Sequence, residues 1–495
     1  MAGKNKTVRN VVIGVVALVV LAGIYFLVTK WEPQQEVQEE PQATPQKIQL
    51  FQAAVADVTQ VEVDSIQGTH LRYYKRVEDK TSTDADGNET VEQDDVWYIE
   101  GYEGANLTST KIENSVSDFA NMAAELEITS DMSKKAEYGL DEPSAKAVMT
   151  LQDGTVYTVL LGSQVPTSNN YYAMLEGTDT IYTISQYKAA LMTNEPLSLK
   201  DTMIGSIAVD DFQNFSLTEN GEKKMDVRRL QDSDNLLNAN MTDYVMTYPY
   251  YEAVRAEEFQ EILEGIASIS ATEYVAYAPA DLAAYGLEQP RYTVSLADSQ
   301  NSYQIKIGAN APKEEGDTIQ YVYAMEEGDS CVFTMSSSIV DSLKKVDAFS
   351  LMEKFLHLVN VSNVQQVVVE GEGKTYTLDV EHYTDQNDLG EDFEEQRYKI
   401  NGKDANQDRS KKVYQGIIGL RASTSAANNV GEVRYTITFH MLDGTQSVIQ
   451  YADYDERNYA AIKDGTPTGF AVLKQGINDM MNLLADLDSD PTRED

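Results

Sequence analysis

The stretch YGLDEPSAKAVMTLQDGTVYTVLLG, residues Tyr138–Gly162, decides the fold, because it returns in altered form as YGLEQPRYTVSLADSQNSYQIKIG, residues Tyr285–Gly308. Each copy opens on Tyr-Gly-Leu-acid-x-Pro and continues with two alternating strands joined by a short polar turn. The glycine can adopt a positive φ at the end of a helix, and the proline begins a strand without needing a backbone donor. The motif therefore predicts a corner that leads the chain from a helix into a β-hairpin.

The same order of segments occurs a third time without the Tyr-Gly-Leu signature, in RYTITFHMLDGTQSVIQY at 434–451. The turn aspartates Asp153, Asp298 and Asp443 are 145 residues apart in both intervals. A fixed period is the signature of a structural repeat. We expect repeat 1 at 57–192, repeat 2 at 212–346 and a degenerate repeat 3 at 361–487, followed by an acidic tail at 488–495.

Each copy also contains a run with helical spacing of its apolar residues, at 109–126, 256–269 and 410–420. In the first run the apolar stripe consists of Ile112, Val116, Phe119, Met122 and Leu126. The strands alternate with period two and are linked as hairpins. The predicted fold class is α+β, with mainly antiparallel sheet and helices packed on one face, repeated three times in tandem.

The first part of the chain predicts a membrane anchor. Residues 11–28 are apolar and uncharged, and at 1.5 Å per residue they span about 27 Å, close to the thickness of a bilayer core. Basic Lys4, Lys6 and Arg9 precede them, which places the N-terminus in the cytoplasm. We expect a cytoplasmic tail at 1–10, a transmembrane helix at 11–29 and a Pro/Gln/Glu-rich linker at 30–56. A cleaved signal peptide is the alternative, but its apolar core is usually shorter and ends at a small-x-small site.

Composition restricts the class of partner. The chain has 495 residues, 42% of them hydrophobic, and a formal net charge of −41. Such a surface repels phosphate backbones, so we expect no nucleic-acid partner, and a solvated face explains the charge most simply. The single cysteine, Cys331, excludes an internal disulfide and lies in a predicted strand, where a buried, inert thiol is expected.

The tandem order of YGL-acid-x-P, a TLxDG-like turn, LLG, YYAM and IYTI resembles the domain of unknown function 4340 family. The resemblance covers the first two copies well and the third in outline. It implies a bacterial protein with one N-terminal membrane span, from a family often encoded beside ABC transporters of the gliding-motility type. The motif residues of the family have no assigned chemistry, so the resemblance implies no functional residues.

Two short motifs suggest ligand sites but fit them poorly. GEGKT at 371–375 lacks the first glycine of a P-loop, because that position is Val368, and its alternating flanks predict a hairpin turn. Residues 82–93 resemble a calcium loop, but the twelfth position is Gln93 and not a bidentate glutamate. A hairpin loop is favoured there, with a weak calcium site as the alternative.

No catalytic signature occurs in the sequence. The four histidines, His70, His357, His382 and His440, are far apart, and HExxH, CxxC and GxSxG are all missing. We therefore expect no enzyme activity, no cofactor and no metal site. A pair of glycosidase carboxylates would not be recognisable among 80 acidic residues.

Tyrosines at matching places in the copies are the candidate binding residues: Tyr171, Tyr172, Tyr321, Tyr323 and Tyr459. Their rings would stack on sugars or contact a partner protein, or would pack in the core with the hydroxyl at the surface. We expect a single-pass protein of the bacterial cell membrane, with most of the chain extracytoplasmic. It would act as an accessory or scaffold protein for ABC transporter subunits or other envelope proteins. A glycan-binding module of the envelope and an unrecognised hydrolase are the alternatives.

Overall fold

The computed structural model describes residues 47–66, 69–83, 89–234, 236, 242–313, 316, 318–386, 392–426 and 430–494. The predicted membrane helix at 11–29 and the tip of the suggested calcium loop lie outside these residues. Among the described residues, no helix has both the length and the apolarity that a membrane crossing requires.

The chain divides into two compact units. One comprises the chain up to Val58 with Val63–Thr69 and Ser117–Thr193, and the other comprises Thr59–Glu62, His70–Val116 and the chain from Asn194 onwards.

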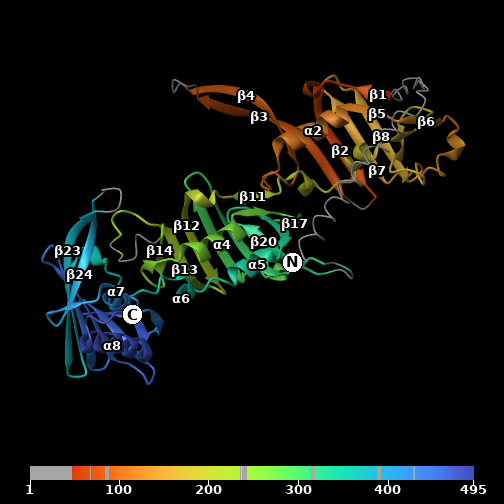
Figure 1. Ribbon diagram of the computed structural model, residues 1–495. Coiled ribbons are helices and arrows are strands. Elements are labelled where there is room, and N and C mark those ends of the chain that lie inside the picture. The colour runs from red at the N-terminus through yellow and green to blue at the C-terminus, as the bar shows by residue number, and fades with distance from the viewer. Residues whose placement is uncertain are drawn as a thin grey trace, which may run out of the picture. The chain divides into compact units, whose positions relative to one another are not determined.

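Three large sheets, which we call the first, second and third sheet, account for most strands (Figure 1). The order of the first sheet is β4 (Glu89–Ile99), β3 (His70–Thr83), β2 (Val58–Ser65), β7 (Ala145–Leu151), β8 (Val156–Gln164), β9 (Tyr171–Leu175), β10 (Ile181–Ile184) and β6 (Leu126–Thr129).

The second sheet is ordered β15 (Glu252–Ala253), β14 (Tyr244–Tyr248), β13 (Glu222–Arg229), β12 (Phe212–Glu219), β18 (Tyr292–Asp298), β19 (Ser302–Asn310), β20 (Tyr321–Glu326), β21 (Cys331–Ser336) and β17 (Glu273–Tyr277). The third sheet is ordered β25 (Lys403–Ala405), β24 (Asp392–Ile400), β23 (Lys374–Gln386), β22 (Val364–Gly371), β27 (Val433–Met441), β28 (Gln446–Asp453), β29 (Asn458–Lys463), β30 (Thr466–Leu473) and β26 (Ala422–Ser425).

The three strand orders correspond. In each sheet the first long strand (β2, β12 or β22) lies centrally, between the hairpin that follows it and the strand after the corner (β7, β18 or β27). The strand pairs for which registers are resolved are antiparallel. The fold is mainly antiparallel sheet with helices, in agreement with the predicted α+β class.

Short strands precede the first two sheets. β1 (Ile48–Gln52) pairs with β5 (Asn121–Ala124), and β11 (Met203–Ser206) pairs with β16 (Ser268–Ser270). The predicted linker at 30–56 is therefore too long, because β1 is ordered by pairing and its Phe51 is buried. Composition did not show this, because the partner strand lies about 70 residues further along the chain.

The helices are α2 (Ser109–Ala120), α3 (Gln186–Ala190), α4 (Ala256–Ile266), α5 (Ser338–Leu343), α6 (Ala348–Leu351), α7 (Gln407–Ile418) and α8 (Lys474–Ser489). Short 3-10 turns are η1 (Val55–Asp57), η2 (Met132–Lys134), η3 (Pro196–Leu199), η4 (Val209–Asp211), η6 (Ala283–Tyr285) and η7 (Val361–Asn363). The predicted helix 109–126 is wrong after Ala120, where the chain forms β5 and β6. The predicted helix 256–269 likewise ends at Ile266. Helix α7 begins at Gln407, three residues before the predicted start at Ser410.

The Tyr-Gly-Leu motif forms the predicted corner. Gly139 and Gly286 have φ of 70° and 68°, and Gly286 ends the turn η6. Leu140 and Leu287 are buried beneath the corner. A Cβ added to Gly162 or to Gly308 would lie 2.2 Å from the carbonyl oxygen of Tyr138 or Tyr285. The glycines that end LLG and KIG are thus required by the close approach of the corner backbone.

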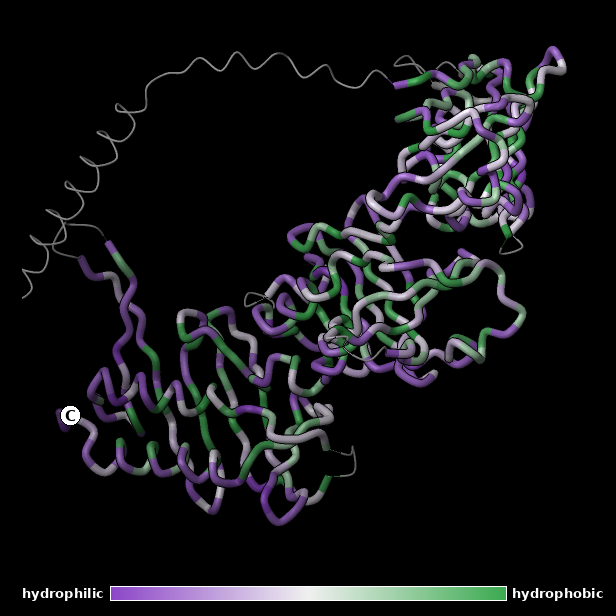
Figure 2. The backbone as a smooth tube through the Cα atoms, turned by 90° about the vertical axis from the view of Figure 1, so that its right-hand side faces the viewer, coloured by the Kyte–Doolittle hydropathy of each residue, from purple (hydrophilic) through white to green (hydrophobic). Residues whose placement is uncertain are grey.

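Hydrophobic residues concentrate along the strands and hydrophilic residues along the turns (Figure 2). One continuous core runs through the second and third sheets and includes Phe215, Phe259, Val367 and Tyr414. An isolated bridge pairs Val254, after β15, with Met352, after α6, and Tyr250 contacts Phe470 on β30 of the third sheet, with ring centroids 5.0 Å apart.

Candidate functional site

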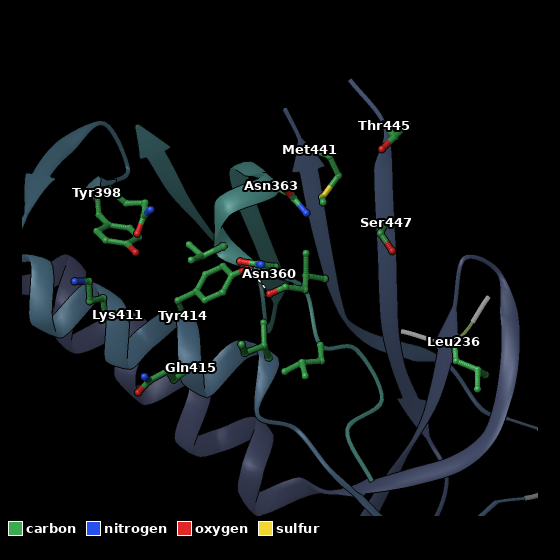
Figure 3. A pocket seen from close by; sticks show the side chains of 15 residues that line it. Leu236, Asn360, Asn363, Tyr398, Lys411, Tyr414, Gln415, Met441, Thr445 and Ser447 are labelled. Carbon is green, nitrogen blue, oxygen red and sulfur yellow. Dashed lines mark hydrogen bonds between the residues drawn. The ribbon is translucent and has the colours of Figure 1, made fainter. Parts of the chain in front are cut away.

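A pocket of about 910 Å³ lies beside helix α7 and the third sheet (Figure 3). One wall is the face of α7 formed by Lys411, Tyr414, Gln415 and Ile418. Their spacing of three and four residues places these side chains on a single helical face. The volume is in the usual range for small-molecule sites.

The opposite side of the pocket comes from the hairpin of β27 and β28, which contributes Met441 at the end of β27, Thr445 in the turn and Ser447 on β28. Figure 3 shows Asn360 and Asn363, from the segment before β22, between these strands and the helix. Asn360, Gln415 and Thr445 are exposed, whereas Tyr414 is buried. The pocket therefore combines an apolar interior with a rim of carboxamide and hydroxyl groups.

The pocket exists because the third sheet carries smaller side chains than the second. Tyr303 lies opposite Leu296, and Ser447 lies opposite Phe439, at the equivalent place in the strand order. Tyr303 is buried and its hydroxyl donates to the carbonyl of Ile266 at the end of α4. A serine at this place leaves unfilled the space beside the helix that a tyrosine ring fills in the second sheet.

Two further positions carry smaller side chains in the third sheet than in the second. In the second sheet Phe212 and Phe259 contact Tyr244 edge-on, with ring centroids 5.5 and 5.3 Å away. In the third sheet the first residue of β22 is Val364 and the fourth residue of α7 is Ser410. The third sheet thus has a valine and a serine where the second sheet has Phe212 and Phe259, although Tyr414 and Phe439 keep an aromatic contact there, with ring centroids 6.4 Å apart.

Hydrogen bonds hold the walls of the pocket. The Tyr414 hydroxyl donates to the carbonyl of Val359 over 2.9 Å, and burial raises the pKa of Tyr398 to about 12. The Lys411 ammonium donates to Glu395 over 3.0 Å, and this hydrogen bond is the main cause of the lowered pKa of Glu395. Lys411 is the only charged residue in the described lining, so Glu395 leaves the pocket close to electrically neutral.

The predicted tyrosines are distributed over three sheets. Tyr171 and Tyr172 lie on β9, Tyr321 and Tyr323 on β20, and Tyr459 on β29. Tyr172 and Tyr323 contact the corner residues Tyr138 and Tyr285, with centroids 4.5 and 5.0 Å apart, and Tyr459 contacts Tyr435. All five are half-buried and none lines the pocket. Their role in binding stays a prediction.

The sequence contained one signal for the pocket. Tyr157 and Tyr303 both stand five residues before the glycine of the corner contact, and Tyr157 stacks on Phe51 with centroids 4.4 Å apart. The third copy has Ser447 at this place. An alignment of the copies by strand register, instead of by their turn aspartates, would have marked the loss of the ring.

A second hollow, of about 690 Å³, lies over strands of the second sheet and contains the carboxylates Asp226, Glu326 and Glu327. Lys223 pairs with Asp226, and Lys306 pairs with Glu327 over 2.5 Å. Within the described part of the chain no group of three or more His, Cys, Asp or Glu side chains could hold a metal. Two of the three carboxylates in this hollow are thus neutralised by lysines.

The most buried ion pair joins Lys200 to Asp329, with 2.7 Å between Nζ and Oδ2 and side-chain exposures of 8% and 9%. Lys200 also donates to the carbonyl of Ala105 over 2.7 Å. Burial is the largest single influence on Asp329 and opposes its ionisation, but the hydrogen bonds from Lys200 and from the backbone N–H of Cys331, together with the positive charge of Lys200, lower the pKa of the carboxyl. Cys331 lies beside this pair on β21, and burial raises the pKa of its thiol to about 12. The predicted buried thiol is confirmed.

Comparison with known proteins identifies the family. The model of the domain of unknown function DUF4340 matches residues 97–279 and 245–435, which together make up more than half of the chain. The chain belongs to this family. The matches begin in β4 and in β14, which occupy the same place in the first and second sheets, so the family pattern follows the repetition of the fold. No curated protein and no solved structure matches the chain.

Proposed function

We propose that the protein is a membrane-anchored, extracytoplasmic accessory or scaffold protein of the bacterial envelope, built from three tandem repeats, which binds subunits of an ABC-type transporter. The observation that carries this proposal is the repetition of one strand order in three sheets. Repeated modules present extended binding surfaces, whereas a single enzyme site needs no repetition. The N-terminal span at 11–29, predicted from sequence, supplies the anchor.

The hairpin of β3 and β4 is a candidate contact element. It continues past the rest of the first sheet as a two-stranded ribbon (Figure 1). Its Val77 and Val91 are 63% and 62% exposed, and Arg76 lies over the rings of Tyr74 and Tyr98 at 5.1 and 5.2 Å. An exposed arginine beside half-buried tyrosines is typical of protein interfaces, and the two exposed valines add apolar surface.

Site-specific photo-crosslinking tests the proposal in intact cells. A photoreactive residue is placed at Val77 or Val91 of the full-length protein, and at Val156 as an equally apolar control that is 53% exposed. We expect a transporter permease or ATPase to be crosslinked from the ribbon positions and not from Val156. Recovery of the protein alone, or with wall fragments only, contradicts a transporter-associated role.

Localisation is tested separately. Cells are fractionated, the membranes are washed with alkaline carbonate, and protease is applied to spheroplasts. We expect the protein to remain with the membrane and the region from residue 47 onwards to be digested from outside. Release by carbonate, or protection from the protease, contradicts the anchored, extracytoplasmic arrangement.

A further inference from the structure

We propose that the pocket beside α7 binds an uncharged, N-acetylated saccharide. The pocket includes the place that a tyrosine ring fills in the second sheet, so this part of it has room for a ring-shaped group. The choice of an envelope saccharide rests on the proposed extracytoplasmic location. The pocket itself is defined by residues of the third sheet, of α7 and of the segment before β22, together with Leu236.

The lining provides the hydrogen-bonding groups that a saccharide needs. Asn360, Asn363, Gln396 and Gln415 are carboxamides, and Thr445 and Ser447 are hydroxyls. A carboxamide both donates and accepts, so it pairs with sugar hydroxyls and, in particular, with the N–H and C=O of an acetamido group. The methyl of that group matches the aliphatic interior near Val359 and Met441.

Charge argues against an ionic ligand. Lys411 is already neutralised by Glu395 over 3.0 Å, so an anion finds no free cation among the described lining residues. A cation finds no carboxylate there. A charged ligand would therefore lose its hydration without gaining an ionic partner.

Strand pairing argues against an extended peptide. β27 is paired on both sides, with β22 and β28, and β28 is paired with β27 and β29. Tyr398 on β24 is likewise paired with Ala405 on β25. A peptide that adds to a sheet needs an open edge, whereas this lining offers side chains. A compact ligand recognised by side chains fits this arrangement.

Isothermal titration calorimetry on the detergent-solubilised full-length protein tests the inference. The probe is the β-1,4-linked trimer of N-acetylglucosamine, and the comparator is cellotriose, which lacks acetamido groups. We expect the trimer to bind at least about tenfold more tightly than cellotriose, since each lost hydrogen bond weakens binding by roughly this factor. Lack of trimer binding, or equal binding of the two sugars, overturns the inference.

Two variants and a control locate the site. Ser447→Tyr restores the ring of the second sheet and is expected to abolish binding while the protein keeps its circular dichroism spectrum. Gln415→Ala removes an exposed carboxamide from the rim and is expected to weaken binding about tenfold, even if Ser447→Tyr does not fold. Gln475→Ala, on α8 and outside the lining, is the control.

Undiminished binding to folded Ser447→Tyr, or to Gln415→Ala, places the sugar elsewhere and overturns the inference. The fractionation experiment reports on location alone, so a failure of the proposed function and a failure of this site are distinguishable.

Discussion

At the scale of single residues, His357 is the most unusual side chain. It is 3% exposed, neither ring nitrogen has a hydrogen-bond partner among the described residues, and its ring contacts Phe439. Burial is the main cause that lowers its pKa to about 4, with a smaller contribution from the positive charge of Lys463, opposed by Asp464. The folded protein therefore keeps this imidazole neutral where the unfolded chain would protonate it.

This predicts a pH-dependent stability. Between pH 6.5 and about pH 4 the unfolded state binds more protons at His357, so the free energy of unfolding falls as the pH falls. The shift corresponds to about 3 kcal/mol. We expect His357→Leu to remove this loss, as measured by urea unfolding at pH 7 and pH 4.5.

His440→Leu removes a histidine from β27 and is the control. Burial raises the pKa of Glu252 to about 7, which makes stability fall as the pH rises through the same window. The quantity to compare is therefore the difference in the free energy of unfolding between the variant and the wild type at each pH. If the free energy of unfolding of His357→Leu falls with pH as much as that of the wild type, the histidine is not buried in this way.

The corner glycines give a second prediction for single residues. Gly162→Ala places a Cβ against the carbonyl oxygen of Tyr138, which is backbone and cannot move aside. We expect a loss of about 2 kcal/mol or more in the free energy of unfolding, measured by denaturant titration. Gly476→Ala, in α8, meets Leu420 at an acceptable 3.4 Å and should leave stability unchanged or increase it by up to about 1 kcal/mol. Equal effects of the two changes would contradict the corner contact.

At the scale of elements, Arg409 ties the first turn of α7 to the end of α8. Its side chain is 5% exposed and its guanidinium donates to the carbonyl and carboxylate of Asp486 over 2.9 and 2.7 Å. Arg409→Met removes this buried donor but leaves a carboxylate that is half exposed to water, so we expect a loss of about 1–2 kcal/mol in thermal or urea unfolding. Arg493→Met removes an exposed partner of the same carboxylate and should cost less than about 1 kcal/mol. A small effect of Arg409→Met would mean that α8 is held by its apolar face alone.

The ends of the helices show where local patterns are insufficient. Met122 fits the helical stripe of α2, but it also fits the alternation of a strand, and it is fully buried in β5. Pairing with β1 decides between the two, because Met122 lies opposite Phe51. The same competition ends α4 before β16, which pairs with β11.

At the scale of the whole molecule, the buried pair of Lys200 and Asp329 connects segments that lie far apart in the chain. Lys200 follows η3, Asp329 lies in the turn between β20 and β21, and the carbonyl of Ala105 completes the contact. Lys200→Met leaves a buried carboxylate without its partner, and we expect a loss of about 3–5 kcal/mol. Lys345→Met breaks an exposed pair with Glu261 and should change stability by less than about 1 kcal/mol. Similar melting curves for both variants would show that the Lys200 contact contributes little.

The sequence by itself determined the features that depend on a few neighbouring residues. Alternation defined the hairpins, the glycines of the Tyr-Gly-Leu corner adopt the expected positive φ, and GEGKT forms the predicted turn between β22 and β23. These features are local because turn and strand preferences are set by the backbone freedom and the side-chain pattern of adjacent residues.

Only the tertiary structure decided the rest. The pocket beside α7 joins Leu236 with residues from 358 to 447, and the contact of Lys200 spans more than 90 residues in either direction. The ring pairing of Tyr138 with Tyr172 likewise depends on how the corner folds against β9. Such contacts follow from which distant segments meet in the core. A space becomes a pocket only when no distant side chain fills it, and Ser447 does not fill it whereas Tyr303 does.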